Sequence, residues 1–325
     1  MKIPDLSSII LVATLVLVLG GAADAQQQPK KVRRIGYLYT GFQAPKEFLD
    51  AMRHLGYVDG HNIVLEYRAA EGREELLPQL ASELVRLNVD VIVAPGAAAG
   101  LAAKQATKTV PVIYMGGGDP VALGLVASLA RPGGNITGIT ELSPELTSKR
   151  LELLKEAFPK ISKVAVLVRD SAPGVAGQLE DLETAARALR LKLQMVRVKG
   201  ADGFENSFLT ITNERAGALI EVPNPLFHAN VNRIVQFTSK NGLPTIFHSK
   251  DFVEAGGLMT YGADFIELYR RAAHFVDKIL KGAKPADLPV EQPMKFELVV
   301  NLKTAKQIGV NIDPNLLARA NRIIR

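Results

Sequence analysis

Short apolar runs alternate along the chain with longer segments in which apolar residues recur every three or four positions. The run at residues 35–40 predicts a β-strand, and Phe48, Met52 and Leu55 share one face of a helix expected at 45–55. Further strands are expected at 62–68, 89–94 and 110–115, with helices at 76–87 and 100–106. Strands that alternate with helices pair in parallel through crossovers, and continuously apolar strands lie in sheets covered on both faces. This stretch therefore predicts a doubly wound α/β lobe.

The same order of elements begins again at residue 164. Ile35 and Ile63, in the first two strands, are 28 residues apart, and so are Val164 and Lys192 in the repeat. The repeat predicts strands at 164–170, 191–198, 218–222 and 244–247, with helices at 176–189, 204–215 and 229–239. A unit of about 110–130 residues that occurs twice is typical of two similar lobes and not of a solenoid. The expected fold class is therefore α/β, with two doubly wound parallel-sheet lobes.

The segments between and after the repeats are rich in turn residues. Residues 130–135 precede a strand-like run at 136–140, which is a candidate for the first crossing between the lobes. A long helix is expected to end at Leu280, and a Pro-spaced linker, a short strand at 296–301 and a helix-like tail follow it. These C-terminal pieces are too small to form a third domain, so we expect them to complete the two lobes.

The first 25 residues are expected to form a cleavable signal peptide. Lys2 precedes an apolar run at 9–21, and Ala23-Asp24-Ala25 has the small-x-small pattern of a signal-peptidase site. The run of 13 residues is shorter than the roughly 20 needed to span a bilayer, and no other long apolar run follows. We therefore expect a mature protein that is soluble in the periplasm and not inserted in a membrane.

Composition excludes several kinds of chemistry. The 325 residues include no Cys, which excludes a Cys nucleophile, a Cys-ligated zinc site, an iron–sulfur cluster and a disulfide framework. It also excludes the lipid anchor of bacterial lipoproteins, which is attached to a Cys. The formal net charge of +6 is modest for this length and is expected to reflect a solvated basic surface.

Motifs for cofactor binding and catalysis are missing from the sequence. No Gly-x-Gly-x-x-Gly follows the first strand, and there is no Walker A motif and no Gly-x-Ser-x-Gly elbow. The five His residues lack metal-ligand spacing, and His54, His228 and His274 are expected on helices as surface or packing residues. Basic residues are not interleaved with aromatic ones as in nucleic-acid-binding proteins. We therefore expect a binding function without enzymatic activity, and no cofactor, metal or nucleic acid.

Ligands of open parallel sheets lie beyond the carboxyl ends of the strands, so the residues at those ends form the candidate site. In the first lobe these are Tyr39, Thr40, Gly41, Phe42, Gly96, Ala97, Ala98, Tyr114, Gly117 and Asp119. In the second lobe they are Asp170, Asn224 and Phe247, with Phe227 as a further apolar wall. The aromatic residues among them either form walls of the site or belong to the core.

Two features of these strand ends suit a charged ligand. Residues 96–100 have very small side chains and open a predicted helix, so the N–H groups of Ala97 and Ala98 can approach a carboxylate, helped by the helix dipole. The alternative is that these small residues serve close packing of the helix on the sheet. Asp119 either binds a ligand ammonium or caps a helix expected at 121–130, and Asp170 and Asn224 have the same two interpretations.

Several stretches of the sequence resemble a known family. They are residues 119–121 with 124–138, residues 254–262, and residues 270–273 and 276–282 followed by 296–303. With them, the chain from residue 33 to 325 resembles the ABC-transporter substrate-binding proteins of the group that includes tryptophan- and tyrosine-binding lipoproteins. The resemblance implies a type I periplasmic binding fold, in which two lobes joined by three crossovers close about a hinge on a small molecule. It also implies that an ABC permease in the inner membrane receives that molecule.

The resemblance also gives expected lobe boundaries and a ligand. Residues 33–139 and 261–283 are expected to form lobe 1, and residues 140–260 and 284–325 lobe 2. The ligand is expected to be a small carboxylate-bearing molecule, namely an amino acid, which could be aromatic, or an aromatic acid. The expected contacts are the Ala97 and Ala98 N–H groups and the Thr40 hydroxyl for the carboxylate, Asp119, Asp170 or Asn224 for the polar end, and Tyr39, Phe42 and Phe247 for the walls.

Other functions would use the same fold. A sensor module would present the liganded fold to a receptor in place of a permease. A two-lobed α/β enzyme would need an acid–base pair at the strand ends, where Asp119 and Asp170 supply carboxylates. Because the chain lacks the Cys of a lipoprotein, we expect an untethered periplasmic protein, and we expect it to be a monomer.

Overall fold

The computed structural model describes residues 32–325 apart from 42–45, 142, 170–171 and 294. Arg33–Arg325 form one compact unit. The signal peptide expected at 1–25 lies outside the described residues. In the part of the chain that is described, no helix is both long enough and apolar enough to cross a membrane.

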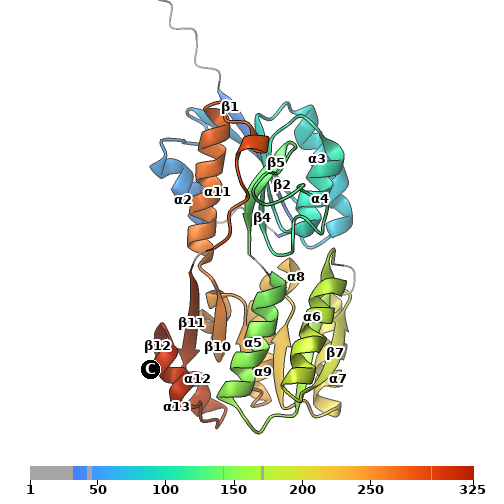
Figure 1. The fold of residues 1–325 in the computed structure, drawn as a ribbon, viewed down its shortest axis with the longest axis vertical. Helices are drawn as coiled ribbons and strands as arrows, with labels where there is room; N and C mark the ends of the chain where they lie inside the picture. The colour runs from blue at the N-terminus through green and yellow to red at the C-terminus, as the bar shows by residue number, and fades with distance from the viewer. Residues whose placement is uncertain (1–31, 42–45, 142, 170–171, 294) are drawn as a thin grey trace, which may run out of the picture. The chain divides into compact units, whose positions relative to one another are not determined.

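The first sheet has the strand order β2-β1-β3-β4-β5, and all its neighbouring strands are parallel (Figure 1). Its strands are β1 (Arg33–Tyr39), β2 (Ile63–Ala69), β3 (Val91–Pro95), β4 (Val112–Gly116) and β5 (Ile136–Thr140). Between them lie α2 (Lys46–His54), the 3-10 helix η1 (Glu74–Leu76), α3 (Leu77–Arg86) and α4 (Ala97–Ala106). In register, Ile35 lies beside Leu65 on one side and Val91 on the other.

The second sheet has the strand order β12-β11-β10-β9-β8-β6-β7. Its strands are β6 (Lys163–Arg169), β7 (Lys192–Val198), β8 (Ala218–Glu221), β9 (Thr245–Phe247), β10 (Met259–Ala263), β11 (Phe296–Asn301) and β12 (Arg322–Ile324). Its helices are α5 (Ser143–Ala157), α6 (Val175–Ala188), α7 (Phe204–Asn213), α8 (Pro225–His228), α9 (Val231–Lys240), α10 (Lys250–Glu254), α12 (Leu302–Gln307) and α13 (Pro314–Arg319), with the 3-10 helix η2 (Ala201–Gly203). Strands β10 and β11 are antiparallel, and the other pairs are parallel. The predicted α/β class with two parallel-dominated sheets is confirmed.

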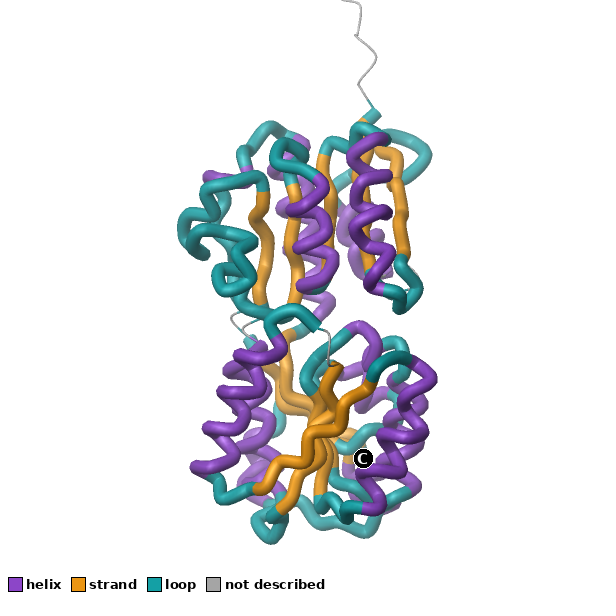
Figure 2. The backbone as a smooth tube through the Cα atoms, turned by 90° about the vertical axis from the view of Figure 1, so that its right-hand side faces the viewer, coloured by secondary structure: helices purple, strands orange, loops and turns teal. Residues whose placement is uncertain are grey.

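Helices cover both faces of each sheet (Figure 2). On the first sheet, Ile35 and Val93 belong to a core on one face, while Leu38 and Ile92 belong to a separate core on the other face. The second sheet has two such cores as well. A strand buried on both faces has no polar side to alternate with, which explains the continuously apolar runs in the sequence.

The C-terminal segments pack on both sheets. Helix α11 (Phe265–Leu280) contacts α2 and the strands β3, β4 and β5 of the first sheet (Figure 1). Strand β10, directly before it, pairs with β9 and β11 in the second sheet. After the 3-10 helix η3 (Pro285–Asp287), Glu291 pairs with Ile139 beside the first sheet, and the chain then enters β11. The residue boundaries expected for the lobes stay a prediction.

The helix expected at 121–130 is wrong, because these residues form a series of turns. The N–H groups of Leu125 and Val126 donate to the carbonyl of Pro120 at 2.8 and 3.2 Å, and Gly124 has a φ of +67°. A left-handed residue cannot continue an α-helix. The apolar spacing that suggested a helix instead buries Leu125 and Val126 in the core beside α4.

Candidate functional site

A cleft of about 440 Å³ lies where the carboxyl ends of strands from both sheets meet. Volumes of a few hundred Å³ are typical of sites for small molecules. Of the residues predicted from the sequence, the cleft is lined by Tyr39, Thr40, Gly41, Gly96, Ala97, Ala98, Gly117 and Asn224. The strand ends of the two lobes therefore line one cavity. That these residues contact a ligand stays a prediction.

The N-terminus of α4 opens into this cleft. Gly96 caps the helix with a φ of 92° and a ψ of 155°, and its own N–H donates to the Met115 carbonyl at 2.8 Å. The N–H of Gly100 makes a helical bond to the Gly96 carbonyl at 3.0 Å. The N–H groups of Ala97 and Ala98 precede the first helical donor, the Gly100 N–H, so they have no acceptor within the helix, and they lie with the positive end of the helix dipole at the cleft.

Several predicted site residues are placed elsewhere. Tyr114 is buried in the core behind the cleft, and its hydroxyl donates to the Gly117 carbonyl at 2.5 Å. Phe247 is buried as well, stacked on Phe252 with ring centroids 4.3 Å apart. Asp119 is exposed and does not line the cleft; its carboxylate accepts from the Val121 N–H at 2.8 Å. These residues follow the alternative interpretations, core packing for the aromatic rings and capping of a turn for Asp119.

The remaining predicted residues fall into three cases. Phe42 and Asp170 lie outside the described residues. Phe227 is fully buried in a core of the second sheet. Asn224 lines the cleft and also caps α8, because its side-chain oxygen accepts from the Leu226 N–H at 2.9 Å. For Asn224 the structure therefore shows the capping role, and its contact with a ligand stays a prediction.

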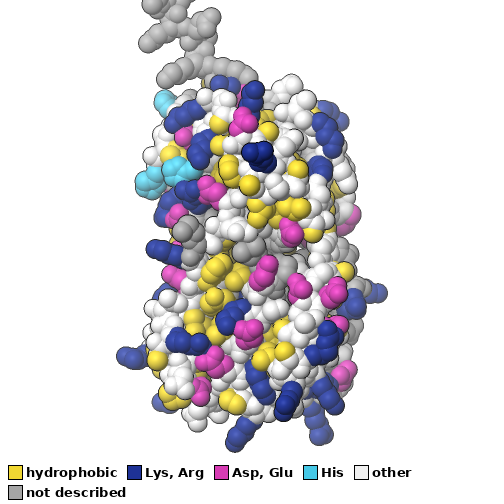
Figure 3. All heavy atoms as spheres, in the orientation of Figure 1, with side chains coloured by type: hydrophobic (Ala, Val, Ile, Leu, Met, Phe, Trp, Pro, Cys, Tyr) yellow, Lys and Arg dark blue, Asp and Glu magenta, His cyan; other side chains and the backbone are white. Residues whose placement is uncertain are grey.

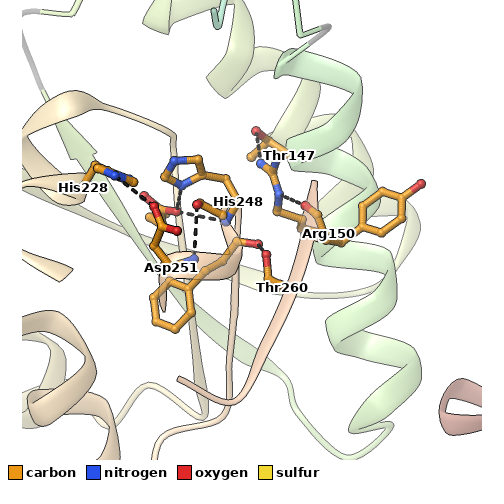
Figure 4. Close-up of polar contacts among 10 residues, drawn as sticks. Thr147, Arg150, His228, His248, Asp251 and Thr260 are labelled. Carbon is orange, nitrogen blue, oxygen red and sulfur yellow. Dashed lines mark hydrogen bonds and ion pairs between the residues drawn. The ribbon is translucent and has the colours of Figure 1, made fainter. Parts of the chain in front are cut away.

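A buried charged network on the side of the second sheet includes His248, which lines the cleft (Figure 4). The Nδ1 atom of His248 contacts the Glu221 carboxylate, which also accepts from the His248 backbone N–H at 3.2 Å. Arg150, on α5, donates from Nε to the Tyr261 carbonyl at 2.6 Å and from Nη1 to the Thr147 hydroxyl at 3.3 Å. Burial lowers the pKa of Arg150 to about 10. Burial raises the pKa of Glu221, but the effects of His248 and Arg150 are larger together, so the pKa of Glu221 is lowered.

A second pair, His228 and Asp251, lies at the edge of the cleft (Figure 4). The His228 Nε2 atom is 3.1 Å from the Asp251 carboxylate. Burial opposes protonation of His228, but Asp251, with the charges of Glu221 and Glu141, outweighs it and raises the His228 pKa. The hydrogen bond from His228 in turn lowers the pKa of Asp251. His228, predicted as a surface or packing residue, thus lines the cleft and pairs with Asp251 there.

Glu141 follows β5 directly and also lines the cleft. It is 6% exposed, and its Oε1 atom is buried without a hydrogen-bond partner among the described residues. Burial raises its pKa, against the lowering effect of His248, Arg150 and His228. On α6, the Oε1 atom of Gln178, which lines the cleft too, is likewise unpaired within the described part of the chain.

Aromatic rings from α11 complete the wall on the side of the first sheet. Phe265 and Tyr269 line the cleft with Tyr39, and burial raises the pKa of both tyrosines. The Phe265 ring meets the His248 ring edge-on, with centroids 5.9 Å apart. Helix α11 thus places an aromatic ring against His248, which belongs to the charged network on the side of the second sheet.

A family model described as ABC transporter substrate binding protein matches residues 42–324. The chain belongs to this family. A tyrosine-binding protein of Clostridioides difficile (strain R20291) is 27% identical over 268 residues, which cover 82% of this chain and 77% of the relative. The predicted resemblance to the ABC transporter substrate-binding proteins is confirmed.

Solved structures share the fold of this family member. A conserved domain protein from Vibrio cholerae has a TM-score of 0.83 at 25% identity, over 90% of this chain and 100% of that one. An ABC domain from Streptococcus pneumonia, in complex with L-Trp, has a TM-score of 0.82 at 25% identity, over 90% of this chain and 99% of that one. The predicted type I periplasmic binding fold is therefore confirmed.

The cleft of this substrate-binding protein contains residues that sequence reasoning missed. The carboxylates that line it belong to Glu47, Glu74, Glu141 and Asp251, and the cationic or titratable bases to Lys250, His228 and His248. Of these, His248 was visible at the end of a predicted strand. Glu141 stands one residue beyond the strand predicted at 136–140, the candidate for the first crossing, so the rule of strand ends applied to β5 points to it.

Proposed function

We propose that this chain is the periplasmic solute-binding protein of an ABC importer, and that its solute is a small carboxylate-bearing molecule. Membership of the family supports a small-molecule ligand and work with an ABC permease. The observation that carries the choice of ligand is the free N-terminus of α4 at the carboxyl edge of the first sheet, inside the cleft. Such a terminus stabilises an anion by its N–H groups and its dipole.

In this proposal the ligand carboxylate accepts hydrogen bonds from the N–H groups of Ala97 and Ala98. Thr40, which is 2% exposed and lines the cleft, donates its hydroxyl to the same group. The apolar part of the ligand lies against Tyr39 and Tyr269. An aromatic side chain on the ligand suits such walls, because ring contacts add to the gain from buried area.

The relatives favour an aromatic amino acid. One is named a tyrosine-binding protein, and the structure from Streptococcus pneumonia holds L-Trp. Both are about a quarter identical to this chain over most of its length. We propose the same class, an aromatic amino acid, for this chain.

The remaining parts of the proposal concern location and mechanism. The sequence pattern of residues 1–25 supports export, and the absence of Cys supports a protein without a lipid anchor. The lobes, at 33–139 with 261–283 and at 140–260 with 284–325, would close on the solute about their hinge without catalysing a reaction. The protein would act as a monomer that meets the permease transiently.

A thermal-shift screen tests the proposal. The panel holds the twenty amino acids, aromatic acids and sugars, and a solute at 100 times its Kd should stabilise the protein by about 2.7 kcal/mol. Mass spectrometry of the purified protein identifies a ligand that co-purifies. If no small solute raises the melting temperature and none co-purifies, the proposal fails.

A further inference from the structure

We propose that Glu141 binds the ammonium group of the ligand, so that the cleft selects zwitterionic amino acids over acids that lack the amine. This inference rests on the proposed function and narrows it, because an amino acid and an aromatic acid share the carboxylate that α4 would bind. The discriminating group must therefore be an anion at a suitable distance from the N-terminus of α4.

Glu141 is an unsatisfied buried acceptor in the cleft. It is 6% exposed, and its Oε1 atom lacks a hydrogen-bond partner among the described residues. Buried polar groups in native proteins nearly always have a partner, and an unpaired one is costly. A ligand that brings a charged N–H donor would supply the partner that the protein does not.

The charged groups around Glu141 make their hydrogen bonds elsewhere. On α5, Arg150 donates to the Tyr261 carbonyl and the Thr147 hydroxyl. After β9, the Nδ1 atom of His248 contacts Glu221, and on α8, the Nε2 atom of His228 contacts Asp251. Arg150, His248 and His228 therefore lower the pKa of Glu141 from a distance, against the larger effect of burial, and leave its Oε1 atom open to a ligand.

Two tyrosines interact electrostatically with Glu141 as well. The hydroxyl of Tyr114, from β4, donates to the Gly117 carbonyl, and Tyr269 belongs to α11.

Sheet register places Glu141 at a distance that an amino acid can span. Pro95 lies beside Met115, and Gly116 lies beside Thr140, so the ends of β3, β4 and β5 are neighbours, with α4 after β3 and Glu141 after β5. The Glu141 N–H donates to the Gly116 carbonyl at 3.2 Å, which fixes its backbone at this edge. Two strand spacings amount to about 10 Å. A ligand whose carboxylate and ammonium are attached to the same carbon spans this distance, together with the Glu141 side chain and one hydrogen bond at each end.

The other acids of the cleft are less suited to this role. The Asp251 carboxylate is bound to His228, and its side chain is 44% exposed. Glu47 and Glu74 are half-buried, whereas Glu141 is buried. Since an ion pair in water is worth little and a desolvated one much more, Glu141 offers the strongest discrimination between a ligand with an amine and one without.

Calorimetry on the purified protein tests the inference. The ligands are L-tryptophan and L-tyrosine, each with its analogue that lacks the amine, indole-3-propionate and 3-(4-hydroxyphenyl)propionate. We expect the protein to bind the better amino acid at least about tenfold more tightly than its analogue. Glu141→Gln should weaken binding of the amino acid by about tenfold to a hundredfold and leave binding of the analogue within about threefold. The matched control Asp119→Asn, at an exposed acid outside the cleft, should change neither.

Each result decides between the two proposals. Equal affinity of the unaltered protein for an amino acid and its analogue overturns the role of Glu141, and needs no variant. Full affinity of a folded Glu141→Gln protein for the amino acid overturns it too. If the protein binds neither amino acid nor analogue, the aromatic ligand class of the proposed function fails, and the inference fails with it.

Discussion

Gly96→Ala should destabilise the protein through backbone conformation alone. Gly96 has a φ of 92° and a ψ of 155°, a combination that is essentially restricted to glycine. A Cβ added there would have Pro225 Cγ, at 3.9 Å, as its nearest neighbour, which is ordinary van der Waals contact. Steric overlap therefore contributes nothing, and the cost is that of holding an L-residue in this region, about 1–3 kcal/mol.

Urea denaturation followed by circular dichroism measures this loss. We expect the free energy of unfolding to fall by about 1–3 kcal/mol, and the melting temperature by about 2–4 °C for each kcal/mol. Gly177→Ala is the matched control. Gly177 lies on an exposed turn of α6, where an added Cβ meets nothing within 4 Å, so the same substitution should stabilise by about 0.5–1 kcal/mol.

The two substitutions are expected to change the free energy of unfolding in opposite directions. A Gly96→Ala protein as stable as the unaltered one would show that this backbone relaxes without strain. If the proposed carboxylate site is right, Gly96→Ala should also weaken binding of the solute, since it tilts the first N–H groups of α4. Gly177→Ala should leave binding unchanged.

Three further predictions concern the charged groups. Arg150→Met should lower the free energy of unfolding by about 3–5 kcal/mol in urea, because it leaves buried carboxylates uncompensated, whereas Arg319→Met at an exposed ion pair should cost at most about 1 kcal/mol. Asp251→Asn should lower the pKa of His228, measured by NMR titration. Because this pKa is raised in the folded protein, the ion pair stabilises the folded state fully at pH values below the pKa of His228 in the unfolded chain. This stabilisation is lost as pH rises through the pKa of His228 in the folded protein. Asp119→Asn should leave solute affinity unchanged in calorimetry, and a loss would return Asp119 to the site.

The sequence predicts the strands correctly where burial on both faces of a sheet makes a strand continuously apolar. The runs that became β3 and β6 are buried along almost their whole length, so their apolar character marked them as central strands. The segment 121–130 shows the limit of this reasoning. Leu125 and Val126 are buried by a turn that depends on the positive φ of Gly124, and a turn of this kind has no periodicity to reveal it.

The sequence predicts which backbone segments form the candidate site better than it predicts which side chains pair within it. Rules about strand ends and helix N-termini locate Gly96, Ala97 and Thr40, because these positions depend on topology. The partners of His228 and Glu221 depend on how side chains from distant elements meet, since Asp251 and His248 come from the segments after β9. Sequence spacing carries no information about such pairs.

Carboxylates outnumber basic groups among the described residues of the cleft, although the chain as a whole has a positive net charge. Lys and Arg side chains, with Asp and Glu between them, are spread over both lobes on the face in Figure 3, and the net charge is +6. Among the described residues that line the cleft, four carboxylates stand with one lysine and two histidines. Local charges act through a low dielectric over a few ångströms, whereas distant surface charges are screened within about 8 Å by physiological salt. A ligand that brings only a carboxylate would satisfy α4 and leave Glu141 unpaired, so the charge pattern favours a ligand that carries both signs.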